Sequence, residues 1–266
     1  MFKRFVLAVV LLLASLDAFA REYTDVYYNP AEAGWGVLLT QSNTFQFLTF
    51  FLYGPDGKPT WYSAQITQDQ NGDYSGPLYA TTGTYFANPS WQGYHINPVG
   101  TASFQPSDPY HATLTYSFTG GPTIVKAVER EPLTPYVLSG DYSGSMSGAV
   151  SNCNDPGRND QAFRGRYGLA VTQAGDQSAS LTFTFVDALH SGILCTVAGP
   201  LAHFGRLYQL NGQLSCTGPE QNGTPHPVTV DALHPTGQGI EGHLAASTGG
   251  GCTASLHFSA VLNVNN

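Results

Sequence analysis

Short runs of β-branched and aromatic residues alternate with glycine, proline, asparagine and aspartate along the chain after residue 22. Such runs, bounded by turn residues, predict antiparallel β-strands. No segment keeps an apolar period of about 3.6 residues beyond two turns, so the pattern disfavours helices. We therefore expect an all-β protein. Its predicted strands lie at residues 35–41, 45–53, 60–67, 74–80, 99–105, 112–118 and 122–130, and then near 137–150, 163–173, 179–187, 192–198, 204–216, 226–233, 238–247 and 253–262.

Turn sequences separate the predicted strands of the first half. Residues 54–58, Gly-Pro-Asp-Gly-Lys, predict a hairpin turn because Asp-Gly suits positive φ angles. Residues 69–73, Asp-Gln-Asn-Gly-Asp, resemble a fragment of a calcium loop. An EF-hand loop needs Glu at its twelfth position, which is Ala80 here, so we interpret this segment as another hairpin turn. We expect residues 82–98 to form a looser region.

The two halves of the chain differ in chemistry. All three tryptophans lie before residue 100, and all four cysteines lie after residue 150. Two prolines within residues 131–135 interrupt any strand ladder between the halves. We therefore predict two modules, residues 21–134 and 135–266, each a small antiparallel β-barrel or sandwich. Their layout is similar to calycin-type barrels by analogy only.

The first twenty residues have the layout of a secretory signal peptide. A basic start with Lys3 and Arg4 precedes an apolar run over residues 5–13, and the segment ends in Ala-Phe-Ala at 18–20. The apolar run is shorter than the ~20 residues that span a bilayer. We expect cleavage near Ala20 and a soluble mature chain, without membrane insertion, in the periplasm or secreted.

The negative net charge of the chain disfavours some classes of binding partner. The formal net charge is −8, and removal of Lys3, Arg4 and Asp17 with the signal changes it to −8 − 2 + 1 = −9. An acidic protein is a poor match for nucleic acid, whose binding depends on Lys and Arg at phosphates. It is equally unsuited to anionic membrane surfaces.

Four cysteines in an exported chain predict two disulfides. No pair has the close spacing of a structural zinc site. Cys195 and Cys216 fall on neighbouring strands of one predicted hairpin. Cys153 ends the first strand of the second module and Cys252 precedes the last, so their bond would close a barrel. We favour this combination among the three possible pairings.

Residues 28–37, Tyr-Asn-Pro-Ala-Glu-Ala-Gly-Trp-Gly-Val, are the most distinctive segment. They resemble the Asn-Pro-x-Glu-x-Gly-Trp-Gly signature of a domain family found in exported proteobacterial proteins. The aromatic hairpin at 45–53, its Asp-Gly turn and Trp61 are also similar to that family. The resemblance covers roughly residues 23–132 and implies export and a β-fold. It implies no catalytic residue, since the function of the family is not established.

The chain lacks familiar catalytic and cofactor motifs. It contains no Gly-x-Ser-x-Gly elbow, no phosphate-binding Gly-x-x-x-x-Gly-Lys loop and no His-Glu-x-x-His. Its eight histidines show no i, i+2 pair on one strand. We therefore expect no catalytic residue, no metal and no cofactor.

The aromatic residues are the best functional lead. They form either the core or a ligand site lined by Trp35, Trp61, Tyr62, Trp91 and Tyr94. Glu32 either fixes a structural corner or joins Trp35 at a pocket mouth. We expect a non-enzymatic binding protein for a small apolar or sugar ligand, or for an envelope or extracellular protein. The alternatives are an inhibitor or immunity-type partner of a secreted enzyme and, more weakly, an envelope hydrolase.

Overall fold

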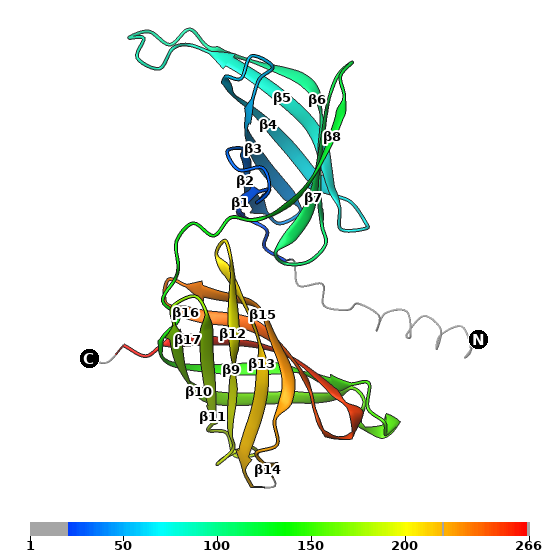
Figure 1. Ribbon diagram of the computed structural model, residues 1–266, viewed down its shortest axis with the longest axis vertical. Helices are drawn as coiled ribbons and strands as arrows, with labels where there is room; N and C mark the ends of the chain where they lie inside the picture. The colour runs from blue at the N-terminus through cyan, green and yellow to red at the C-terminus, as the bar shows by residue number, and fades with distance from the viewer. Residues whose placement is uncertain (1–20, 220, 265–266) are drawn as a thin grey trace, which may run out of the picture.

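The computed structural model describes residues 21–219 and 221–264, and its regular structure is almost entirely β. The predicted signal peptide, residues 1–20, lies outside the described residues. The all-β prediction is confirmed. Figure 1 shows two β-modules, one above the other, joined by an irregular connection between the last strand of one and the first of the next.

The first module is a closed antiparallel barrel of eight strands. Each strand pairs with the next in sequence, and β1 pairs with β8 through Tyr27 opposite Arg130 to close the ring. The strands are β1 (Asp25–Tyr28), β2 (Gly36–Ser42), β3 (Phe45–Tyr53), β4 (Pro59–Gln68), β5 (Tyr74–Gly83), β6 (Tyr94–Pro106), β7 (His111–Phe118) and β8 (Thr123–Arg130).

The interior of this barrel is filled by its own side chains. Along β3, Leu48 and Phe50 point inward and are fully buried, as the period of two in a strand requires. Aromatic rings meet edge to face across the centre, with Tyr27 and Phe104 at 5.0 Å between ring centroids. Tyr74 is also buried. The barrel therefore has a packed core of the kind that fixes a single structure.

The second module is a sheet of nine strands, eight of which form a closed cycle of pairings. The cycle closes where β12 pairs with β13, and β9 pairs with β17 as the first and last strands. The strands are β9 (Gly140–Ser151), β10 (Gln161–Ala174), β11 (Ser178–Phe185), β12 (Leu194–Phe204), β13 (Leu207–Gly218), β14 (Gln221–Asn222), β15 (His226–Thr236), β16 (Gly239–Ser247) and β17 (Thr253–Leu262). Two 3₁₀ turns, η1 (Pro156–Arg158) and η2 (Gly249–Gly251), complete it.

Two disulfides link neighbouring strands of this module. Cys195–Cys216 joins directly opposite residues of β12 and β13. Cys153–Cys252 joins the segment after β9 to the residue before β17, where the sheet brings the first and last strands together. Both pairings are those predicted from the sequence. Disulfides favour an oxidising compartment, in agreement with a periplasmic or extracellular location.

The structure differs from the predicted strands at two places in the first half. β1 was not predicted, because four residues at the start of the domain carry little periodic signal. β6 begins at Tyr94 rather than near residue 99, and β5 continues to Gly83. Together they form a long hairpin where the sequence predicts a looser region. A register shift between Leu78 and Tyr79 accompanies this extension.

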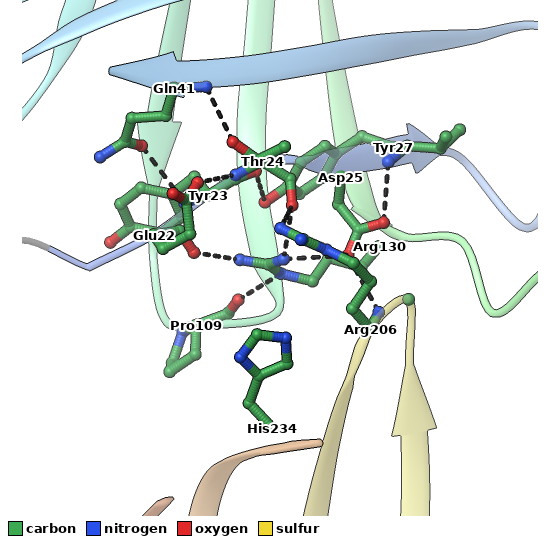
Figure 2. A network of polar contacts seen from close by, with 12 residues as sticks. Glu22, Tyr23, Thr24, Asp25, Tyr27, Gln41, Pro109, Arg130, Arg206 and His234 are labelled. Atoms are coloured by element: carbon green, nitrogen blue, oxygen red, sulfur yellow. Dashed lines mark hydrogen bonds and ion pairs between the residues drawn. The ribbon is translucent and has the colours of Figure 1, made fainter. Parts of the chain in front are cut away.

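A buried polar joint holds the two modules together (Figure 2). One carboxylate oxygen of Asp25, on β1, accepts a hydrogen bond from the Arg130 guanidinium at 2.9 Å. The same oxygen accepts one at 3.0 Å from the backbone N–H of Arg206, in the β12–β13 turn of the second module. The Arg206 guanidinium donates to the carbonyl of Thr24. Arg130 is only 1% exposed, so this ion pair is shielded from water.

A second set of contacts lies beside the first. The Tyr110 hydroxyl donates to the carbonyl of Tyr208 at 3.3 Å and accepts from the N–H of Ala232 at 2.7 Å. The Tyr110 ring lies 4.6 Å from that of Phe204, between centroids. Burial raises the pKa of Tyr110, so its hydroxyl keeps its proton. The modules are thus connected by specific contacts as well as by the chain.

Candidate functional site

The structure divides the predicted aromatic site residues into two groups. Trp61, Trp91 and Tyr94 are exposed, with 49%, 68% and 61% of their surface open to solvent. Trp35 and Tyr62 are half-buried and pack against the barrel core. Three of the predicted residues therefore face solvent, and two pack against the core. Adjacent residues on β4, Trp61 and Tyr62, point to opposite sides of the sheet.

The exposed group belongs to a larger feature on the outer face of the barrel. Phe51 on β3 lies directly opposite Trp61 on β4. On the same face, Ser63 of β4 pairs with Tyr79 of β5, and Tyr79 pairs with Pro98 of β6. The positions of β6 that alternate with Pro98 on its near side, Tyr94 and Ile96, therefore also face outward. We call this face the aromatic wall and define it by its exposed large apolar residues: Leu38, Phe45, Phe47, Phe51, Tyr53, Trp61, Tyr94 and Ile96.

The β5–β6 hairpin extends the barrel at one end, as the long projecting hairpin in Figure 1. Its connecting loop carries three further exposed aromatic residues, Tyr85, Phe86 and Trp91. Thr84 fixes the base of this loop: its backbone N–H and its hydroxyl both donate to the carbonyl of Gly93, at 3.1 and 3.0 Å. The loop therefore presents its aromatic side chains from a hydrogen-bonded base.

The aromatic wall is free of formal charge. Strands β2 to β6 contain no Asp, Glu, Lys or Arg, and none occurs anywhere from residue 74 to 107. The side chains that lie between the aromatic residues of the wall are polar but uncharged, and include Thr40, Thr49 and Gln65. In general, large exposed apolar patches on soluble proteins often mark interaction sites.

Sequence reasoning missed most of the wall. It selected tryptophans and nearby tyrosines, but not Phe47, Phe51, Tyr53 or Ile96. The alternation along β3 was the available signal, because Phe45, Phe47, Phe51 and Tyr53 all share one face. In a run of nine nearly all apolar residues, however, the pattern alone does not tell the inner face from the outer.

Glu32 forms polar contacts with Trp35 and Lys126 at one end of the barrel, which we call its mouth. Its carboxylate accepts hydrogen bonds from the Lys126 ammonium at 2.6 and 2.9 Å and from the Trp35 indole N–H at 3.3 Å. The Lys126 nitrogen also lies 5.9 Å from the centre of the Trp35 ring, within cation–π range. The hydrogen bond from Lys126 holds the pKa of Glu32 below its usual value. Glu32 and Trp35 thus engage each other and β8.

Tyr62 packs against aromatic rings of neighbouring strands. Its ring lies 5.0 Å from that of Phe118, which in turn contacts Tyr116 at 6.1 Å, between centroids. Tyr116 stacks edge to face on the fully buried Phe50. These ring contacts connect the mouth of the barrel to its core. Packing therefore explains the position of Tyr62.

Several histidines have local partners. His190 lies 2.6 Å from Asp187, and His203 stacks on Tyr208 at 4.4 Å. Within residues 21–219 and 221–264, no group of three or more His, Cys, Asp or Glu side chains is arranged to hold a metal ion. Over the same residues, no helical segment has the length and apolar character needed to cross a bilayer.

Comparison with known proteins found no family model that matches the chain and no curated protein similar to it. The resemblance of residues 28–37 to an exported domain family therefore stays a prediction.

Proposed function

We propose that this chain is an exported, non-enzymatic binding protein that binds another envelope or extracellular protein through the aromatic wall. The observation that carries the proposal is the exposure of Phe51, Tyr53 and Trp61 on an outer face without formal charge. Export is part of the proposal and rests on residues 1–20 and on the two disulfides.

A protein partner suits this surface better than a small ligand. Small-molecule sites are concave and enclose most of the ligand. The wall instead lies on the outside of a barrel whose interior is filled. Protein interfaces are enriched in aromatic residues and depleted of charge at their centre, and Trp and Tyr are frequent hot spots there. The partner should present a neutral, apolar surface.

The test places a photo-crosslinking amino acid at position 61 of the full-length chain, in the cells that produce it. We expect a covalent adduct with one defined envelope or extracellular protein. The Phe51→Ser change in the same chain should abolish the adduct, because it removes the neighbouring ring. A crosslinker at position 125 is the matched control, since Val125 is exposed on β8 of the same barrel.

Three outcomes contradict the proposal. An adduct with a second copy of this chain makes the wall a self-association surface. Equal crosslinking from positions 61 and 125 indicates non-specific contact. The absence of any protein adduct, together with a shift of Trp fluorescence on addition of neutral oligosaccharides, makes the wall a glycan site.

A further inference from the structure

A surface hollow on the second module brings together features that the aromatic wall does not use. It has a volume of about 640 Å³ and is lined by residues of β9 and β10 and of the loop after β11. Arg164 and Arg166 of β10 and Ser145 and Ser147 of β9 all contribute. The loop adds Leu189.

The sheet register places these polar groups in a compact array. Arg164 lies opposite Ser147, and Arg166 opposite Ser145, on paired antiparallel strands. The four side chains share the outer face, because they alternate with the buried residues Met146 and Gly165. The two arginines are two residues apart on one strand, about 7 Å along it. Two guanidinium groups at this separation can converge on one group of oxygen atoms.

Arg164 and Arg166 differ from the other Lys and Arg side chains within residues 21–219 and 221–264. Lys58, Lys126 and Arg130 each form an ion pair with a carboxylate. Within the part of the chain that the structure describes, the guanidinium groups of Arg164 and Arg166 have no hydrogen bond or ion pair. In an acidic protein this leaves two adjacent positive charges for an external anion.

The carboxylate of Asp187, which lines the hollow, already has other partners. One oxygen lies 2.6 Å from His190 Nδ1 and the other accepts from the backbone N–H of Arg166 at 3.1 Å. It thus fixes the loop to β10 and leaves the arginine side chains unpaired. Beside it, Leu189 is 88% exposed and gives the hollow an apolar edge.

We propose that this hollow binds an amphiphilic organic anion, with carboxylate or phosphate oxygens on Arg164 and Arg166 and an apolar chain against Leu189. Planar guanidinium groups match the oxygen geometry of both head groups. The serine hydroxyls supply further hydrogen bonds to the head. The site lies on the second module and is independent of the function proposed for the aromatic wall.

The test is isothermal titration calorimetry of the mature chain, residues 21–266, with three probes of equal chain length. We expect octanoate or octyl phosphate to bind and octanol to bind at least about tenfold more weakly, because it lacks the charge. The tighter of the two anions identifies the head group as carboxylate or phosphate ester. Added salt should weaken binding of both, since the site is exposed.

Variants locate the binding site. The double change Arg164→Gln and Arg166→Gln should weaken anion binding about tenfold or more. Lys58→Gln, which removes one exposed charge from the first module, should leave it unchanged. Phe51→Ser with Trp61→Ser should also leave it unchanged, so failure of this site and failure of the aromatic wall are distinguishable. All substituted side chains are exposed or on the outer face, and circular dichroism checks that each variant is folded.

Octanol binding as tight as octanoate binding overturns the proposal, and so does an arginine double variant with full affinity. Loss of anion binding in the wall variant but not in the arginine variant assigns the ligand to the first module instead. No heat of binding with either anion also overturns it.

Discussion

At the scale of single residues, the charge with the largest expected effect on stability is that of Arg130, which is buried. Arg130 is surrounded by acceptors: Asp25, and the backbone carbonyls of Glu22, Thr24 and Pro109. A buried cation is tolerated only when paired and hydrogen-bonded. Asp25 is the only formal negative charge among these acceptors, so it carries the charge compensation for the group.

Asp25→Ala should therefore lower the free energy of unfolding by about 3–5 kcal/mol, the usual effect of leaving a buried ion without its partner. Asp56→Ala is the matched control, because the Asp56–Lys58 pair is exposed and should contribute much less to stability. Equilibrium denaturation in urea measures both. Equal effects of the two changes would show that Arg130 does not depend on Asp25.

Glu32 offers a residue-scale prediction on pH. Its pKa is lower in the folded protein than in the unfolded chain, because Lys126 donates to the ionised form. The stabilisation is therefore present above the unfolded pKa of about 4.3 and is lost as the pH falls through the lower folded value. Wild type should be more stable than Glu32→Gln at pH 7, and the difference should disappear in acid. A difference that is constant from pH 7 to pH 2.5 would contradict this account.

At the scale of elements, the sequence predicted strands well where turns bound them and failed where packing decides. The hairpin turns at 54–58 and 69–73 locate β3, β4 and β5 because Asp-Gly and Asn-Gly specify tight turns. The short strand β1 exists because Arg130 and β2 hold it in place. Likewise, the alternation along β3 separates Phe50 from Phe51, but only the closed barrel shows which of them is inside.

The disulfides could be predicted because each follows from strand order alone.

The two disulfides also give a prediction about the stability of the strands that they join. In the chain-entropy model, the bond between Cys153 and Cys252, 99 residues apart, contributes about 4.7 kcal/mol. The Cys195–Cys216 bond, 21 residues apart within one hairpin, contributes about 3.3 kcal/mol. Replacing Cys153 and Cys252 by Ser should thus destabilise the protein by about 1.4 kcal/mol more than replacing the other pair. Thermal and urea unfolding of the two double variants tests the order, and a reversed order would contradict it.

At the scale of the whole molecule, the joint between the barrels was beyond sequence reasoning. Asp25 and Arg130 are 105 residues apart, and Asp25 and Arg206 are 181 apart. No local pattern marks such partners, because the contacts exist only once both barrels have closed. The joint connects the barrel that carries the aromatic wall to the barrel that carries the hollow lined by Arg164 and Arg166.

Gly205 provides a direct test of that framework. It lies in the β12–β13 turn with φ of +57°, and a Cβ there would lie 2.3 Å from an Asp25 carboxylate oxygen and 2.8 Å from the Arg130 Cβ. Gly175, in the β10–β11 turn, has the same φ, but a Cβ there would meet no atom within 4 Å. The two positions therefore share the backbone strain of a left-handed alanine, about 1–2 kcal/mol, and differ only in the contact with the first barrel. Gly205→Ala should separate the barrels and increase the radius of gyration in small-angle X-ray scattering, whereas Gly175→Ala should leave the radius unchanged. If both variants keep the compact profile of the wild type, the joint tolerates the added methyl group and the barrels do not depend on close approach at this turn.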